Sequence, residues 1–313
     1  MSIYLCIDGG TTNTRLHLVR DGAILETVRI SLGARAGIED RTALRHSLRD
    51  AIPELLSRFS LSESDVRCIL ASGMLTSEFG LYPVDHISAP AGIDELHRSL
   101  VETQLPDISP LPFVFVPGVK IRGTSYRETD VMRGEETELM GITRSVSDCV
   151  FVLPGSHAKV IRTDEEGRIT DFSTLLSGEM AAALSAHTIL AGAVDLACPT
   201  ISREYLLLGC EDAETMGLNR TLFKTRILKT QYSRTPEETY SYFLGAVLSG
   251  DLAEILRFDA ATVILGGRAS LKNALSILLE EKSCCTVITL DESEADTAVP
   301  RGMVRVYEHI GTK

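Results

Sequence analysis

The feature that most constrains the fold is a pattern of elements that occurs twice along the chain. Residues 3–30 predict an apolar strand, a glycine turn, a second strand, a two-residue turn and a third strand. The same order returns at 150–174, where residues 150–156 correspond one by one to residues 4–10. One shared glycine turn could arise by chance, but agreement over both halves favours duplication. We therefore expect two similar α/β lobes, 1–145 and 146–313, with a cleft between them.

Helix and strand patterns complete each half. Apolar residues at steps of three or four predict a helix from about Glu39 to Phe59, which Pro53 should kink. In the second half, Thr235-Pro236-Glu237-Glu238 predicts a helix start, with Thr as N-cap, Pro at the first position and Glu at the third. Shorter elements are expected in both halves: a helical stretch at 94–102, strands at 66–71, 113–116, 262–265 and 286–290, and helices from 270 and over 297–310.

Charge limits the partners that such a chain can bind. Lys and Arg number 31 and Asp and Glu number 43, which gives a formal net charge of −12. This sign argues against a nucleic-acid-binding surface or a polybasic membrane anchor, and an anionic ligand needs local positive groups. No apolar run approaches 18 residues, and no basic region precedes the short N-terminal apolar run. We therefore expect neither a transmembrane helix nor a signal peptide.

The seven cysteines indicate neither a disulfide framework nor a metal site. Their number is odd, and no pair has Cys-x-x-Cys spacing. We expect buried, reduced thiols in a cytoplasmic protein. No His/Cys cluster has zinc spacing, and no nucleophile elbow accompanies a possible Ser-His-Asp set.

The first glycine turn follows a strand that ends at Asp8. Small residues let a backbone approach a bound group, and N–H and hydroxyl donors can cradle phosphate. The turn residues of this kind are Gly9, Gly10, Thr11, Thr12 and Asn13. Asp8 could face a magnesium ion directly or through water. The alternative is a hairpin that simply needs glycine, and no Walker-loop Gly-Lys-Ser/Thr follows.

Two later turns share these features. Gly155-Ser156 follows the first strand of the second copy and precedes His157 and Lys159. A lone histidine is more often structural, but here it lies in the turn that corresponds to the first phosphate-type turn. Gly266-Gly267-Arg268 ends a strand and opens a helix, where a nucleoside or an anionic group could approach the helix N-terminus. Plain strand-to-helix turns have the same sequence.

An acidic block at 131–139 is the least ordinary segment. Charged residues stand between apolar ends: Arg133, Glu135, Glu136 and Glu138. We expect Asp130 to cap a helix whose first turns the glutamates stabilise. That accounts for Glu138 but not for Gly134, because glycine within a helical turn costs about 1 kcal/mol relative to alanine. A small residue there predicts that something packs against its backbone.

Together these motifs resemble the 2-dehydro-3-deoxygalactonokinases, sugar-acid kinases of the actin/hexokinase/Hsp70 superfamily. The resemblance extends over nearly the whole chain, and its most specific part is Val131–Thr137. The other matching segments are Asp8–Asn13, Pro154–Lys159, Phe172–Glu179 and Gly266-Gly267. It implies a duplicated ribonuclease-H-like, two-lobe α/β fold. It also implies ATP-dependent phosphorylation of 2-dehydro-3-deoxy-D-galactonate at its 6-hydroxyl, with Mg²⁺.

The resemblance also implies roles for the candidate residues. Asp8 would position Mg²⁺, and Arg133, His157 or Lys159 would meet the substrate carboxylate, with Glu179 as a further substrate-binding residue. ATP and its phosphates would be bound by the three turns, through Gly9, Gly10, Thr11, Thr12, Asn13, Gly155, Ser156, Gly266, Gly267 and Arg268. The chain departs from the superfamily at Pro154, where an Asp is usual. It also has Glu135 and Glu136 where many hexokinase-like members have a catalytic Asp.

One of these two glutamates is expected to be the general base. Successive helix residues are about 100° apart, so Glu135 and Glu136 cannot both face one point. Residue 136 lies along the apolar stripe of Met132 and Leu139, which leaves Glu135 to face the cleft as the base. Alternatively, Glu136 pairs with Arg133, or both acids merely offset the helix dipole.

Other functions remain open. The chain could phosphorylate another keto-sugar acid or a hexose, or it could be a non-catalytic nucleotide-gated sensor with the same fold. A homo-oligomer is also compatible with the sequence.

Overall fold

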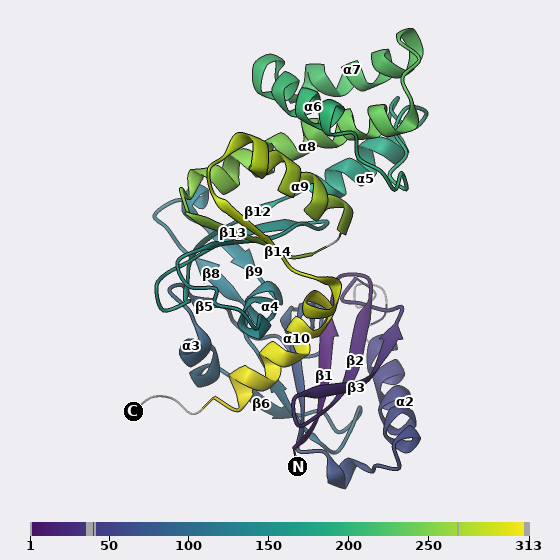
Figure 1. Ribbon diagram of the computed structural model, residues 1–313. Helices are drawn as coiled ribbons and strands as arrows, with labels where there is room; N and C mark the ends of the chain where they lie inside the picture. The colour runs from purple at the N-terminus through teal and green to yellow at the C-terminus, as the bar shows by residue number, and fades with distance from the viewer. Residues whose placement is uncertain (1, 36–39, 41, 268, 310–313) are drawn as a thin grey trace. The chain divides into compact units, whose positions relative to one another are not determined.

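The computed structural model describes residues 2–35, 40, 42–267 and 269–309 (Figure 1). The chain forms two compact units. Unit 1 comprises Met1–Val146, Glu165–Asp171 and Ser293–Lys313, and unit 2 comprises Ser147–Asp164 and Phe172–Glu292. The C-terminal segment therefore belongs to the unit built mainly from the first half of the chain.

The sheet of unit 1 has six strands in the order β3-β2-β1-β4-β7-β6. Their bounds are β1 Ile3–Gly9, β2 Thr14–Arg20, β3 Ala23–Ile30, β4 Cys68–Gly73, β6 Val101–Gln104 and β7 Pro112–Phe115. The hairpin strands β1, β2 and β3 are antiparallel, whereas β4 runs parallel to both β1 and β7. Parallel pairing of β1 with β4 brings their carboxyl ends to one edge of the sheet.

The second sheet repeats this arrangement in the order β12-β11-β10-β13-β14 and belongs to unit 2, apart from residues 169–171 at the start of β12. Its strands are β10 Val150–Leu153, β11 Ala158–Thr163, β12 Ile169–Leu175, β13 Thr262–Leu265 and β14 Thr286–Thr289. As in unit 1, the first hairpin is antiparallel and the following strands pair in parallel. The matching order of strands confirms the predicted duplicated α/β fold.

A small third sheet corrects the interpretation of the acidic block. It contains β5 Ile87–Ser88, β8 Val119–Ile121 and β9 Asp130–Met132. Asp130 accepts a hydrogen bond from the N–H of Val131 at 2.7 Å and does not cap a helix. Helix α4 begins only at Glu135 and ends at Gly141, with Gly134 as its N-cap. The predicted helix over 131–134 is wrong because those residues form a strand and a turn.

One long helix of unit 1 packs on β2 and β3 of its sheet. Helix α2, Ala43–Arg58, contains Pro53 and buries Leu44, Leu48 and Ile52 against the core, as the apolar spacing predicts. Its predicted start at Glu39 lies outside the described residues. Shorter or later elements are the helix α3 Ile93–Arg98, the 3-10 helices η1 Glu63–Asp65, η2 Met74–Thr76 and η3 Tyr126–Glu128, and the last helix α10 Glu292–Tyr307.

Unit 2 carries a group of helices, of which the sequence analysis predicted two, the helix that begins after Thr235 and the helix from about 270. Between β12 and β13 lie α5 Ser177–His187, α6 Arg203–Met216, α7 Leu218–Gln231 and α8 Pro236–Arg257, and α9 Ala269–Lys282 follows β13. The predicted start of α8 is confirmed, since Thr235 and Glu238 form a capping box in which Glu238 N–H donates to Thr235 Oγ1 at 3.2 Å. Helices α6 and α7 pack on α8 (Figure 1).

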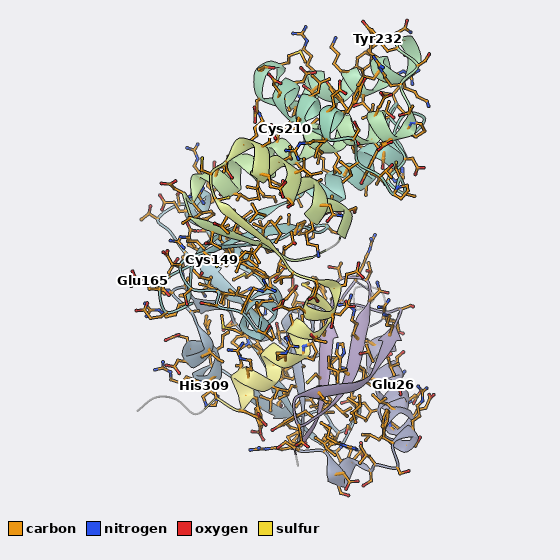
Figure 2. The ribbon with its side chains drawn as sticks, viewed as in Figure 1. Glu26, Cys149, Glu165, Cys210, Tyr232 and His309 are labelled. Carbon is orange, nitrogen blue, oxygen red and sulfur yellow. The ribbon has the colours of Figure 1, made fainter. Side chains whose placement is uncertain are left out.

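Burial of the cysteines agrees in part with the expectation. Cys6, Cys68, Cys149 and Cys210 are buried free thiols, and Figure 2 marks Cys149 and Cys210. Cys284 is exposed. Among the helices of the described residues, none is long and apolar enough to cross a membrane.

The α6–α8 contact provides a direct test of this packing. A Cβ at Gly245 would lie 2.0 Å from the carbonyl oxygen of Leu206, and one at Gly209 would lie 2.0 Å from that of Tyr242. A backbone carbonyl cannot rotate away as a side chain can, so Gly245→Ala can be accommodated only if the two helices move apart. This change should lower the free energy of unfolding by about 3 kcal/mol. Urea denaturation measures the change.

Gly250→Ala is the matched control on the same helix. No atom lies within 4 Å of a Cβ at Gly250. Alanine is the better helix former, so this variant should gain about 0.5–1 kcal/mol. Equal stability of the two variants would contradict the close packing of α6 on α8.

Candidate active site

The carboxyl ends of β1 and β4 form the base of a candidate site in unit 1. The two strands pair in parallel with Asp8 opposite Ser72 and Gly9 opposite Gly73. Residues paired in this way point to the same face of a sheet. Asp8 and Ser72 therefore share a face at the sheet edge, where ligands commonly bind in α/β folds.

Glycines allow the start of α4 to approach this edge. Gly73 has φ 73° and Gly134 has φ 105°, backbone conformations that other residues rarely adopt. A Cβ at Gly73 would lie 2.5 Å from the carbonyl oxygen of Gly9, and one at Gly134 would lie 3.2 Å from Cα of Gly73. The backbone of Gly73 is thus what packs against Gly134, as its small size predicted.

Three carboxyl groups interact at this edge. Asp8 Oδ2 lies 3.2 Å from an Arg15 guanidinium nitrogen, and the Asp8 side chain is 18% exposed. Burial raises the pKa of Asp8, Arg15 opposes this change, and the charge of Glu135 adds to it. Burial, followed by the charges of Asp8 and Glu135, raises the pKa of Glu138 to about 8. Carboxyl groups whose pKa is raised by burial and by neighbouring acids are typical of functional sites.

Ser72 adds a polar group to the same edge. Its side chain is fully buried, and its Oγ has no hydrogen-bond partner within the described part of the chain. An unpaired buried hydroxyl is destabilising by roughly 1–3 kcal/mol, so a water molecule or a ligand group is its expected partner.

The two candidate bases have different environments. Glu136 is fully buried, and both of its carboxyl oxygens accept from the N–H of Gly134, at 2.9 and 2.8 Å. Burial, with a further contribution from Glu135, raises the pKa of Glu136 to about 8. Glu135 is only half-buried, and its Oε2 accepts from the N–H of Arg133 at 3.0 Å. Glu136 therefore holds the turn before α4, whereas solvent can reach Glu135.

A pocket of about 570 Å³ lies next to this turn. It is lined by Thr76, Ser77, Glu78, Pro83, Val84, Asp85 and Arg133. One guanidinium nitrogen of Arg133 donates to Thr76 Oγ1 at 2.6 Å, and another lies 3.3 Å from His86 Nδ1. The volume falls within the usual range for small-molecule sites.

The first predicted phosphate turn is exposed, and backbone hydrogen bonds from residues 34 and 35 support it. Gly10, Thr11, Thr12 and Asn13 are exposed, and the N–H of Gly10 donates to the carbonyl of Asn13 at 2.9 Å. The N–H groups of residues 34 and 35 donate to the carbonyls of Gly10 and Thr11 at 3.1 and 2.9 Å. The turn thus has a fixed shape with hydroxyl groups open to solvent.

In unit 2, the predicted second turn packs on the start of α5. A Cβ at Gly178 would lie 2.0 Å from the carbonyl oxygen of Gly155, and the N–H of Glu179 donates to the carbonyl of Ser156 at 3.0 Å. His157 Nε2 lies 2.8 Å from Glu179 Oε2. The structure therefore brings together two residues that were predicted separately as substrate-binding.

The predicted adenosine turn lies against the same segment of unit 2. A Cβ at Gly267 would lie 2.6 Å from the carbonyl oxygen of Pro154, and the N–H of Gly266 donates to the carbonyl of Val152 at 2.8 Å. Arg268 lies outside the described residues. Lys159 is buried in β11, opposite Leu153.

A divalent cation fits the edge of unit 1 only if substrate phosphates and waters complete its coordination shell. Within the described residues, no three His, Cys, Asp or Glu side chains are placed to hold a metal together. Mg²⁺ at kinase sites normally takes one or two carboxylates and completes its shell with waters and substrate phosphates. Asp8, with Glu135 and Glu138 as acidic neighbours, supplies carboxyl oxygens of this kind at the edge.

Comparison with known proteins decides the family. Residues 8–306 match the family model for 2-keto-3-deoxy-galactonokinase. The chain belongs to this 2-keto-3-deoxy-galactonokinase family. The result confirms the family that the sequence motifs indicated, and the match includes the residues of both units described above.

Similar proteins agree with this membership. A 2-dehydro-3-deoxygalactonokinase of Escherichia coli (strain K12) is 27% identical over 256 residues, covering 79% of this family member and 78% of the relative. A Rhizobium meliloti (strain 1021) protein named as a probable 2-dehydro-3-deoxygalactonokinase is 30% identical over 194 residues, which span 61% of this chain and only 59% of that protein. A crystal structure from Sinorhizobium meliloti with the same provisional name has a TM-score of 0.78 at 24% identity and covers 97% of both chains.

Sequence reasoning missed several residues at the site of this 2-keto-3-deoxy-galactonokinase family member. Glu138 was explained as a helix-stabilising acid, although its position three residues after Glu135 places both on one helix face. Thr76 and His86 contact Arg133 from positions 57 and 47 residues away in the chain. No local pattern marks such contacts, whereas the i, i+3 spacing of the glutamates could have been recognised.

The buried carboxyl of Glu136 predicts a pH dependence of stability. The folded chain keeps this proton up to about pH 8, whereas an ordinary glutamate releases it near 4.5. The folded state thus binds more protons between these values, so stability falls as the pH rises through them. Glu136→Gln should make this fall shallower, because the amide does not titrate. Urea denaturation at pH 5, 6.5 and 8 measures it.

Glu128→Gln is the control for this effect. Hydrogen bonds from Thr124 lower the pKa of the exposed Glu128, so its contribution to stability is lost only as the pH falls below the ordinary range. The Glu128→Gln variant should keep the wild-type slope between pH 5 and 8. Parallel slopes for wild type and Glu136→Gln would show that Glu136 is ionised in the folded chain.

Proposed function

We propose that the protein is an ATP-dependent kinase that phosphorylates 2-dehydro-3-deoxy-D-galactonate at its 6-hydroxyl, a step of D-galactonate breakdown. The observation that carries this proposal is the acidic edge of unit 1, where Asp8, Glu135 and Glu138 interact beside the close contact of Gly73 with Gly134. Phosphoryl transfer needs positioning and charge neutralisation above all, and a rigid edge with several carboxyl groups suits both. Membership of the family supports the choice of a kinase.

The glycine turns are the proposed nucleotide-binding segments. In unit 1, the turn that follows buried Gly9 is exposed over Gly10–Asn13 and offers N–H and hydroxyl donors. In unit 2, Ser156 is exposed and Gly155 and Gly267 are half-buried, and the N-terminus of α5 begins next to Ser156. Backbone donors and a helix N-terminus favour phosphate.

Asp8 is the proposed residue for Mg²⁺. Bound there, the ion would neutralise charge on the phosphates of ATP. The Asp8 carboxylate is held by Arg15 at the end of a buried strand, so its position is fixed before any ligand arrives. Ser72 offers a hydroxyl for a water molecule in the same place.

Glu135 is the proposed general base. It begins α4, it is half-buried rather than enclosed, and the N–H of Arg133 orients one of its oxygens. A carboxylate in this position could accept the proton of an attacking hydroxyl. Glu136 is a weaker candidate, because both of its oxygens are used by the N–H of Gly134.

An ADP-release assay tests the activity. ADP release should depend strongly on 2-dehydro-3-deoxy-D-galactonate and on magnesium. Equal turnover with glucose or glycerol would favour a broader sugar kinase. Nucleotide binding without ADP release from any sugar or sugar acid would favour the nucleotide-gated sensor instead.

Replacement of the base tests the mechanism. Glu135→Gln should lower kcat by about 10²- to 10⁴-fold, the usual effect of removing a general base, with little change in KM for ATP. Glu136→Gln should lower kcat less, since its carboxyl acts on the turn and not on the substrate. A larger loss of kcat in Glu136→Gln would transfer the role of base to Glu136.

A further inference from the structure

The pocket of Thr76, Asp85 and Arg133 contains one basic group that is held in a fixed orientation. Of the described residues that line it, Arg133 is the basic one. We propose that this pocket is the carboxylate subsite for a sugar acid, with Arg133 as the binding residue and His86 as the residue that positions Arg133. The proposal rests on the proposed kinase function for what happens at the reacting end of the substrate. Binding of the carboxylate at the other end does not depend on that function.

The hydrogen bonds around Arg133 fix the direction of its guanidinium. A guanidinium only donates, so Thr76 Oγ1 and His86 Nδ1 must both accept. The hydroxyl of Thr76 in turn donates to the carbonyl of Gly73 at 2.9 Å. Arg133 is therefore linked through one side chain to the same glycine that supports the start of α4.

His86 is restricted to one neutral tautomer by this contact. Because its Nδ1 accepts from Arg133, its proton lies on Nε2. Nε2 is buried and has no hydrogen-bond partner among the described residues. Close packing holds the ring in place, since a Cβ at Gly118 would lie 2.8 Å both from the His86 ring and from the Arg133 side chain. A neutral acceptor can orient the guanidinium without offsetting its charge.

The two other predicted carboxylate-binding cations are less suitable. His157 already pairs with Glu179 at 2.8 Å. Lys159 is 5% exposed and lies within a sheet. Arg133 instead lines an open pocket, and its partners at the guanidinium are a hydroxyl and an imidazole.

The other pocket groups suit the hydroxyl-bearing part of a sugar acid. Glu78 and Asp85 are exposed, and Ser77 offers a hydroxyl. Carboxylates and hydroxyls accept hydrogen bonds from sugar hydroxyls. Glu135 lies two residues after Arg133 and contacts its N–H at 3.0 Å. One turn of backbone thus carries both the proposed carboxylate-binding residue and the proposed base.

Calorimetric titration tests the subsite without turnover. The probes are 2-dehydro-3-deoxy-D-galactonate and its uncharged methyl ester. Arg133→Gln should weaken binding of the acid by about 10- to 100-fold, the usual range for a lost charge-assisted hydrogen bond, and should leave the ester nearly unaffected. Arg122→Gln makes the same charge change at an exposed residue of unit 1 outside the pocket, and it should bind the acid as wild type does.

The positioning role of His86 needs a second pair of variants. His86→Asn keeps an acceptor near the position of Nδ1, whereas His86→Leu removes it. His86→Leu should raise KM for the sugar acid about 10-fold with little change in kcat, and His86→Asn should restore most of the affinity. Equal behaviour of the two variants, or wild-type binding of the acid by Arg133→Gln, would overturn the proposal. If Arg133→Gln does not fold, the two His86 variants still decide, by titration with the acid.

The outcomes separate this subsite from the proposed function. A wild-type protein that binds the acid more tightly than the ester but releases no ADP would retain the subsite and refute the kinase. Turnover of the acid by Arg133→Gln with an unchanged KM would retain the kinase and refute the subsite. Absence of both binding and turnover would refute both.

Discussion

The contact between three glycine backbones is the constraint on which the candidate site depends. Gly9, Gly73 and Gly134 stack so closely that a methyl group on Gly73 would overlap the carbonyl of Gly9. Two of the three have positive φ values. This stack puts the end of β1, the end of β4 and the start of α4 at one place. Asp8, Ser72 and Glu135 are neighbours because nothing larger than hydrogen separates the segments that carry them.

The other side of α4 is held by the same kind of contact. A Cβ at Gly141 would lie 1.7 Å from the carbonyl of Ala298, and one at Gly302 would lie 1.9 Å from that of Thr137. Arg301 and Arg305 of α10 donate to the carbonyls of Gly141 and Met140, so they satisfy acceptors at the end of α4. With both ends fixed, α4 presents its glutamates in one orientation. Unit 2 has similar glycine contacts: Gly178 packs against the backbone of Gly155, and Gly267 packs against that of Pro154.

The sequence predicted the parts of the fold that have a local cause. Alternating apolar residues and glycine turns located β1 to β3 and β10 to β12, and the capping box located the start of α8. Helix α4 was placed too early, because Val131-Met132 pairs with β8, a contact that no local pattern reveals. Burial of Glu136 followed from its apolar stripe, whereas the partners of Arg133 depend on tertiary packing. Functional roles for these residues stay predictions.

The pKa of Glu136 bears on how an acidic chain can bind an anion. Because the net charge of the chain is −12, an anionic ligand can be attracted only by a cationic side chain whose charge is not already neutralised by a nearby carboxylate. Arg15 is paired with Asp8, so its charge is largely matched. Arg133 has Glu136 nearby, but burial raises the pKa of that carboxyl to about 8, so it is mostly neutral at pH 7. Asp85, the other acid whose charge acts on Arg133, is exposed, so solvent screens its charge. Enclosing Glu136 therefore both fixes the turn before α4 and leaves a positive charge available at the pocket.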